Sequence, residues 1–213
     1  MARRAGPLAE QLAQHLRDRI LGGDPPGGDR VSELSVTNEY GVARPTAKAA
    51  LDILVMEGLV SREPYSALRV TTVAAGEVPE LLALLEVVEQ LAVGRILREG
   101  PDLRSLRDAA RSAADRVLEV MVEAAASSRL SRTHRQGTLE LALATGRRTP
   151  FPAATDAGLR VRAEALTESL FLLQEAPART ALSDLQEQRR ELSGAPGTPR
   201  FALEGTPAAA VDR

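Results

Sequence analysis

Residues 27–60 constrain the fold more than any other part of the chain, because they predict two short helices joined by a tight turn. Ser32 is placed to cap the first helix, since a serine hydroxyl can accept a backbone N–H at a helix start. Gly41 lies where the chain must reverse, a position that favours residues tolerant of positive φ. Pro45 opens the second helix, where its missing N–H costs little. This layout predicts a helix-turn-helix, whose second helix lies in the DNA major groove.

The second of these helices has two chemically different sides. Its apolar side is expected to pack into the core, and Gly58 is expected to end the helix. The residues on the apolar side are Ala47, Ala50, Leu51 and Leu54. The residues on the other side are Arg44, Thr46, Lys48 and Asp52. We expect this polar side to face nucleic acid.

The neighbouring segments carry a family resemblance that covers roughly the first 75 residues. Residues 7–23 predict a helix, because Leu8, Leu12, Leu16 and Ile20 repeat at helical spacing before two glycines. Together with the link 25–33, the stretch 41–51 and the stretch 57–62, this segment resembles the winged helix-turn-helix of the GntR family, FadR-type branch. The resemblance implies DNA contacts by Ser32, Arg44, Pro45, Thr46, Lys48 and, in the wing, Ser66.

Several positions depart from the family pattern. The family usually has Ser at Ala43, and Arg at both Leu34 and Lys48. Lysine keeps the charge of arginine but lacks the fork that reads guanine. The wing tip, residues 65–68, lacks the usual Gly. Residues 1–76 also carry 9 Lys and Arg against 9 Asp and Glu, whereas a phosphate-binding module normally shows a basic excess or face. These departures favour weaker DNA binding more than a changed fold.

The composition limits what the rest of the chain can be. Of the 213 residues, 44% are hydrophobic but only 2% are aromatic, so the core must be built from Leu, Val and Ala, which favours helices. The absence of cysteine excludes disulfides, thiolate metal sites and cysteine nucleophiles. We find no apolar run long enough to span a membrane and no signal-peptide pattern, and expect a cytoplasmic location.

The second part of the chain shows only helical patterns. We expect domains at residues 1–74 and 75–213, and a mainly α fold in which a winged helix-turn-helix (three helices plus a small β-wing) precedes an all-α helical bundle that binds an effector. The predicted helices of the bundle cover residues 78–98, 102–126, 131–145, 153–175 and 177–192. In the first of them we expect Leu81, Leu84, Leu85, Val88, Leu91 and Ile96 to be buried.

Two stretches of the bundle, 80–86 and 139–147, resemble the effector domain called FCD. Many such domains hold a divalent metal through an Asp, a His four residues later and two further His. The corresponding positions here are His134, Thr138 and Gln188, and the last His would lie on a helix beyond Arg213. This poor ligand set predicts no metal cofactor, and leaves the three residues as candidate effector contacts. Alternatively, His134 is a solvent-facing or pocket-lining residue, and His15 is a partly buried packing residue.

Two hypotheses of function remain open. The first is a GntR-like regulator that binds a palindromic operator on double-stranded DNA as a homodimer and responds to a small-molecule effector. The alternative is a relative that binds DNA weakly or not at all and serves as a ligand-binding or protein-interaction module. An enzyme is not expected, because no paired carboxylate with a nucleophile, phosphate loop or metal cluster stands out.

Overall fold

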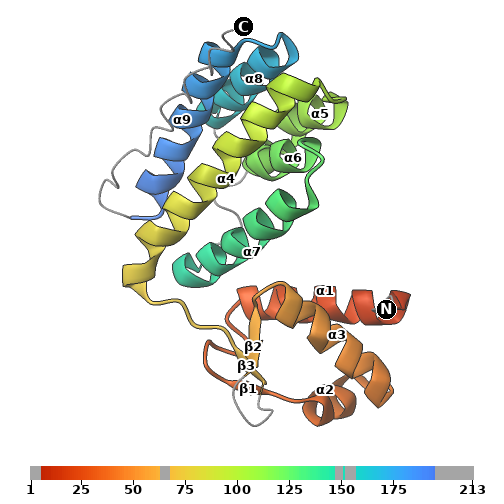
Figure 1. Cartoon of the computed structure of the whole chain (residues 1–213). Helices are drawn as coiled ribbons and strands as arrows, with labels where there is room; N and C mark the ends of the chain where they lie inside the picture. The colour runs from red at the N-terminus through yellow and green to blue at the C-terminus, as the bar shows by residue number, and fades with distance from the viewer. Residues whose placement is uncertain (1–5, 63–67, 147–150, 152–156, 195–213) are drawn as a thin grey trace, which may run out of the picture.

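The computed structural model describes residues 6–62, 68–146, 151 and 157–194, and its elements form an N-terminal winged helix-turn-helix and a helical domain (Figure 1). The N-terminal domain consists of α1 (Pro7–Leu21), β1 (Arg30–Val31), α2 (Glu33–Tyr40), α3 (Arg44–Met56), β2 (Val60–Arg62) and β3 (Leu68–Val70). The fold predicted from the sequence, mainly α with a small β-wing, is confirmed.

The local signals of the helix-turn-helix act as expected. Ser32 caps α2, and its Oγ accepts the backbone N–H of Ser35 at 3.0 Å, while the Ser35 hydroxyl reaches back to the Ser32 N–H at 3.1 Å. Gly41 ends α2 with φ of 63°, in the left-handed region where glycine is unstrained. Ala43 stands at the N-cap of α3 without a side-chain cap, and Pro45 lies in its first turn.

The apolar sides of the three helices meet in one core. The predicted apolar side of α3 is buried, together with Leu12, Leu16 and Val36 from α1 and α2. An ion pair between Arg17 and Glu57 (Nη2 to Oε1, 2.6 Å) joins α1 to the end of α3. The strands form an antiparallel sheet in the order β1-β3-β2. Leu8, the first of the four residues whose spacing predicts α1, is 56% exposed.

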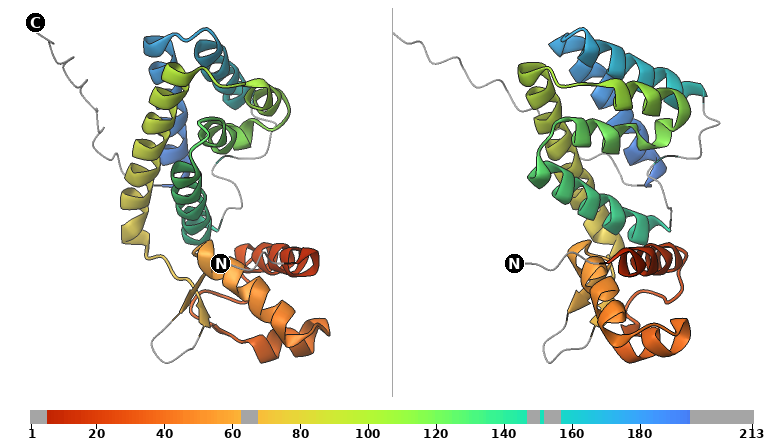
Figure 2. Two further views of the ribbon diagram at one scale, coloured as in Figure 1. Left: turned by 45° about the vertical axis from the view of Figure 1, so that its right-hand side comes forward. Right: turned by 90° about the vertical axis from the view of Figure 1, so that its right-hand side faces the viewer.

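The helical domain begins after a short 3-10 turn, η1 (Ala75–Glu77). Its elements are α4 (Val78–Glu99), α5 (Arg104–Ser112), η2 (Ala114–Arg116), α6 (Val117–Ala124), α7 (Ser128–Thr145), α8 (Ala157–Phe171) and α9 (Glu175–Leu192). The long helix α4 packs against α6, α7 and α9, and α8 packs against α5 and α9. Figures 1 and 2 show this stack of helices on one side of the N-terminal domain, with α7 nearest to it.

Three sequence predictions for the helical domain are wrong. The helix predicted at 153–175 ends at Phe171, and α9 already begins at Glu175. Residues 102–126 form α5, η2 and α6, not one helix, because Ala113 leaves the helical region with φ of −149° and ψ of 56°. This break lets Leu106 and Met121 enter the same core from two short helices. On α4, Leu84 and Leu91 are 45% and 48% exposed, because the helix turns a different side to its neighbours.

The buried side of α4 includes two carboxylates, Glu86 and Glu89, which a search for apolar spacing passes over. Gly137 of α7 faces this helix, and a Cβ added to it would lie 3.1 Å from Leu85, so glycine permits the close approach of the two helices. No helix in the described part of the chain is both long and apolar enough to span a membrane.

Candidate nucleic-acid interface

The polar side of α3 is presented to solvent as the sequence predicts. The Arg44 side chain is 76% exposed, and Pro45 and Lys48 are exposed as well. Thr46 is half-buried. The orientation of this helix is fixed by its opposite side, because Ala47, Ala50, Leu51 and Leu54 are buried in the core. Two cations are therefore held one helical turn apart on one side of a rigid helix.

Beside this helix lies a groove of about 650 Å³. Its lining residues come from β1, the start of α2, the start of α3 and the two wing strands: Arg30, Val31, Ser32, Glu33, Leu34, Ser35, Arg44, Arg62 and Leu68. Three guanidinium groups thus converge with the N-terminus of α2, whose backbone N–H groups carry a partial positive charge. This combination suits the phosphates of a nucleic-acid backbone.

The sequence analysis did not identify Arg30 and Arg62 as part of this site. They lie 32 positions apart in the chain, and each stands in a strand next to β3, opposite Arg69 and Leu68 respectively. No helical spacing links them to Arg44. The sequence did hold a signal for each residue. Arg30 lies in the family-like link that ends at residue 33, and Arg62 is the basic residue that follows Ser61 at the entry to the wing.

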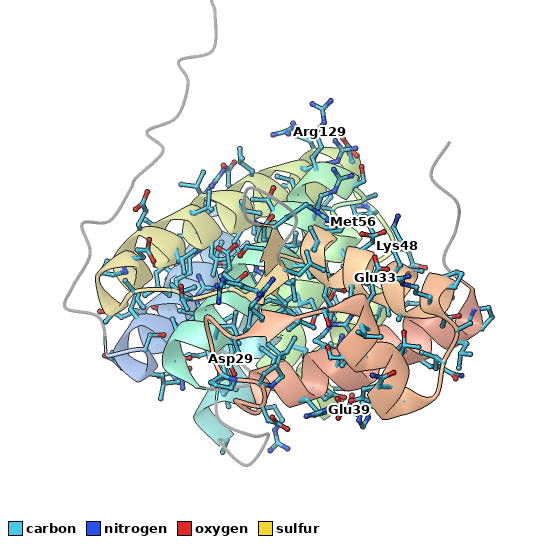
Figure 3. The ribbon with its side chains drawn as sticks, turned by 90° about the horizontal axis from the view of Figure 1, so that it is seen from below. Asp29, Glu33, Glu39, Lys48, Met56 and Arg129 are labelled. Atoms are coloured by element: carbon cyan, nitrogen blue, oxygen red, sulfur yellow. The ribbon has the colours of Figure 1, made fainter. Side chains whose placement is uncertain are left out.

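Acidic neighbours partly neutralise the interface. Arg44 Nε lies 3.6 Å from Glu33 Oε2, and Arg62 Nη2 lies 3.3 Å from Asp52 Oδ1. By contrast, neither Arg30 nor Lys48 forms an ion pair within 4 Å in the described parts of the chain. Figure 3 views the molecule from the side of the N-terminal domain and shows Lys48 and Glu33 projecting from α3 and α2.

The structure brings together only part of the predicted DNA site. Ser32 and Arg44 both line the groove, whereas Pro45, Thr46 and Lys48 extend from it along α3. The Ser32 hydroxyl also accepts the capping hydrogen bond of α2, so its first role is structural. Ser66 lies outside the described residues.

In the helical domain, His134 is 97% buried, so the prediction of a solvent-facing residue is wrong. Its Nε2 lies 2.9 Å from Glu89 Oε1. The Glu89 carboxylate also accepts hydrogen bonds from Arg189 (Nη1 to Oε1, 2.5 Å; Nη2 to Oε2, 3.0 Å) and from Gln186 (Nε2 to Oε2, 2.9 Å). Full burial alone would raise the pKa of Glu89, but Arg189 and His134 lower it to about 2. We call these four residues the Glu89 cluster.

The Glu89 cluster does not fit a divalent metal. The carboxylate that could bind a cation already holds a guanidinium, and that fixed positive charge would repel a metal ion. The described residues contain no group of three or more His, Cys, Asp or Glu able to hold an ion. Thr138 and Gln188 are half-buried on α7 and α9. Beside the cluster, burial raises the pKa of Glu86, whose Oε1 lies 3.3 Å from Arg190 Nε.

The other histidine also differs from its prediction. His15 is exposed on α1 and not partly buried. Its ring meets the Tyr40 ring edge to face, with centroids 5.5 Å apart and an interplanar angle of 76°. Tyr40 in turn accepts a hydrogen bond from Arg19 (Nη1 to Oη, 2.6 Å). His15 therefore covers the end of α2 from the surface.

A protein-family model and a curated bacterial protein each match part of this chain. Residues 8–70 match the family model described as "Bacterial regulatory proteins, gntR family". The "Uncharacterized HTH-type transcriptional regulator YdhC" of Bacillus subtilis is 26% identical over 96 residues, which cover 45% of this chain and 43% of that protein. The match thus spans less than half the length of this curated relative.

Two solved structures share this fold over most of its length. A putative transcriptional regulator GntR from Rhodococcus sp. RHA1 has 21% identity and a TM-score of 0.62, over 89% of this chain and 99% of that one. E. coli McbR/YncC has 17% identity and a TM-score of 0.64, over 89% and 98%. At these identities the likeness shows the fold alone. The comparisons therefore show a likeness to the GntR family at residues 8–70 and a shared fold over most of the chain.

Proposed function

We propose that the chain binds a palindromic operator on double-stranded DNA as a homodimer and that its helical domain binds a small-molecule effector. The observation that carries this proposal is the polar side of α3, where exposed Arg44 and Lys48 continue a groove lined by Arg30 and Arg62. We place the domain boundary between residues 74 and 75, where η1 begins. We also propose an FCD-type effector domain, on the sequence likeness at 80–86 and 139–147.

The arrangement suggests a division of roles at the DNA. Arg44, Thr46 and Lys48 would reach base edges and phosphates from α3 in the major groove. Arg30 and Arg62 would contact the adjacent backbone, together with the start of α2 at Ser32. Pro45 would fix the first turn of α3 against the DNA, and Ser66 would contribute from the wing. A two-fold dimer then requires a palindromic site, because each half-site meets an identical surface.

Helix α7 offers a physical route between the two domains. Its Leu139 and Leu143 pack against the core of the N-terminal domain. A Cβ added to Gly58, after α3, would lie 2.9 Å from Gln136 Cγ, so the two surfaces are in close contact there. The same helix carries His134 of the Glu89 cluster. A ligand that displaces α7 would therefore change the position of α3.

The predicted effector contacts need one adjustment. Because Nε2 of His134 is occupied by Glu89, only the other ring nitrogen of His134 is free of this pair. We propose Thr138 and Gln188 as effector contacts, with His134 contributing through that second nitrogen. The double-stranded DNA and the effector are separate ligands, so each proposal has its own test.

The DNA proposal is tested by titrating the purified chain against DNA from its own promoter region, at about 50 and about 200 mM salt. We expect saturable, sequence-selective binding that falls as salt rises, and a homodimer by sedimentation. Arg44→Ala and Lys48→Ala should each weaken binding at least tenfold, a loss of about 1.4 kcal/mol. Arg162→Ala, an exposed residue of α8, removes the same charge far from α3 and should leave binding unchanged.

The alternative function is a ligand-binding or protein-interaction module without strong DNA binding. The acidic partners of the interface, Glu33 and Asp52, favour it because they compete with phosphate for Arg44 and Arg62. Weak binding to any duplex, equal in the wild type and in Arg44→Ala, would overturn the regulator and support this alternative.

A further inference from the structure

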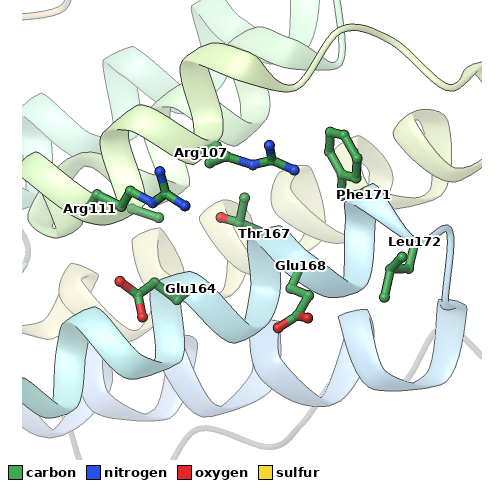
Figure 4. Close-up of a pocket in the computed structure, with 8 residues that line it drawn as sticks. Arg107, Arg111, Glu164, Thr167, Glu168, Phe171 and Leu172 are labelled. Carbon is green, nitrogen blue, oxygen red and sulfur yellow. The ribbon is translucent and has the colours of Figure 1, made fainter.

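A second groove, of about 410 Å³, lies between α5 and α8 in the helical domain and shares no lining residue with the Glu89 cluster (Figure 4). It is lined by Arg107, Ala110, Arg111, Glu164, Thr167, Glu168, Phe171 and Leu172. The volume falls within the range of about 300–1,000 Å³ that is usual for small-molecule sites. None of these residues belongs to the proposed DNA interface or to the predicted effector contacts.

The two walls of this groove carry opposite charges. Arg107 and Arg111 lie one helical turn apart on α5, and Glu164 and Glu168 lie one turn apart on α8. Figure 4 shows the two guanidinium groups on one side and the two carboxylates on the other. No ion pair within 4 Å joins these four side chains in the described structure. The charges therefore face each other across a space wide enough to hold a ligand.

One end of the groove is apolar and aromatic. Phe171 is 48% exposed and Leu172 is 56% exposed. The chain has only three Phe and two Tyr, so one of its few rings is left in solvent at the mouth of a groove. The Arg107 guanidinium lies 4.1 Å from the centre of the Phe171 ring, which holds the cation in place through its electron-rich face. Buried Thr167 and Ala110 form the floor.

We propose that this groove binds a small zwitterion of the amino-acid type with an apolar side group. Its carboxylate would bind the guanidinium groups of Arg107 and Arg111, which offer the parallel N–H donors that a carboxylate accepts. Its ammonium would bind Glu164 and Glu168, and its side group would cover Phe171 and Leu172. The role of this ligand as the effector rests on the proposed function, whereas its binding does not.

The site is tested by calorimetric titration of the full chain, without DNA, with L-phenylalanine, L-leucine and L-methionine. The matched probes are 3-phenylpropionate, which lacks the ammonium group, and phenethylamine, which lacks the carboxylate. We expect at least one of the amino acids to bind, and its binding to weaken at least tenfold on Arg111→Gln and on Glu164→Gln. Each matched probe should bind at least tenfold more weakly than L-phenylalanine if that amino acid binds.

A control variant separates this site from general charge effects. Arg104→Gln removes an α5 arginine that pairs with Asp102 and does not line the groove, so it should leave ligand binding unchanged. Absence of binding by all three amino acids up to about 10 mM, or binding that both groove variants leave intact, overturns the proposal.

Repeating the DNA titration with saturating ligand separates the proposal that the groove binds the ligand from the proposal that this ligand is the effector. Ligand binding that alters the DNA affinity supports the groove as the effector site. Ligand binding that leaves the DNA affinity unchanged supports the site but overturns its role as the effector. If the chain does not bind DNA at all, the calorimetric result still decides whether the groove binds the zwitterion.

Discussion

Removing Arg189 should destabilise the helical domain more than removing any exposed arginine. Arg189 is 1% exposed and Glu89 is fully buried, and the two share two hydrogen bonds. The variant Arg189→Met keeps most of the side-chain length but leaves Glu89 with only His134 and Gln186 as partners. A buried carboxylate is then left without its full counter-charge.

The magnitude follows from these contacts. Each lost hydrogen bond to a charged group contributes about 1.5–3 kcal/mol, so the pair amounts to about 3–6 kcal/mol. Breaking a buried ion pair on one side is known to cost about 3–5 kcal/mol, which agrees with this sum. A domain of this size shifts its melting temperature by about 2–8 °C per kcal/mol. We therefore expect a fall in Tm of at least about 6 °C.

Thermal denaturation followed by circular dichroism measures the fall in Tm, and urea denaturation measures the loss in free energy of unfolding, with Arg135→Met as the control. Arg135 also pairs with a glutamate, Glu123, but both side chains are about half exposed, so its loss should change stability by no more than about 1 kcal/mol. The double variant Glu89→Met/Arg189→Met should recover at least about 2 kcal/mol, because it removes the unpaired charge. A loss below about 1 kcal/mol for Arg189→Met, or a double variant no more stable than the single one, would refute the reasoning.

Three further predictions concern stability. The pKa of Glu89 in the folded protein is about 2, against an ordinary value of 4.5, so its contribution to stability is complete above pH 4.5 and is lost as the pH falls through about 2. The stability of Glu89→Gln should therefore lack this part of the acid dependence. An acid dependence equal to that of the wild type would contradict the prediction. Gly58→Ala should cost more than Gly41→Ala by urea denaturation, because both glycines have positive φ but only Gly58 faces Gln136 and Glu140. Gln136→Ala should therefore remove part of the excess, since it leaves the contact with Glu140 Oε1. Ser32→Ala should cost about 1 kcal/mol through loss of the α2 cap, and a change below a few tenths would show that Ser35 alone suffices.

The N-terminal domain could be predicted because its signals are local. A cap at Ser32, a positive-φ glycine at Gly41 and a proline in the first turn of α3 each act within a few residues, and each appears in the structure as expected. The polar side of α3 follows from the same periodicity. Arg30 and Arg62 reach the groove only through strand pairing with β3, a contact between distant parts of the chain that no local signal contains.

The helical domain was harder to predict because its decisive features depend on tertiary packing. Ala113 carries no signal of a break, and it leaves the helical region between two segments that both pack on the same core. Glu89 looks like a surface residue by composition, since an isolated glutamate is almost never fully buried. It is buried here because Arg189, 100 positions later, supplies the matching charge. A search for apolar spacing therefore placed Leu84 and Leu91 inside instead.

The contrast between a buried ion pair and exposed ion pairs explains how a neutral N-terminal domain could still bind an anion, as proposed. Arg189 is enclosed and fully engaged by Glu89, so no ligand can recruit it. Arg44 and Arg62 are more than half exposed, and their carboxylate partners lie at 3.6 and 3.3 Å. Exposed pairs of this kind contribute only about 0–1 kcal/mol, so a phosphate can replace Glu33 or Asp52 at little cost. If the chain binds DNA as proposed, the equal numbers of acidic and basic residues predict a lower DNA affinity and a weaker salt dependence, without removing the cations that the proposed interface needs.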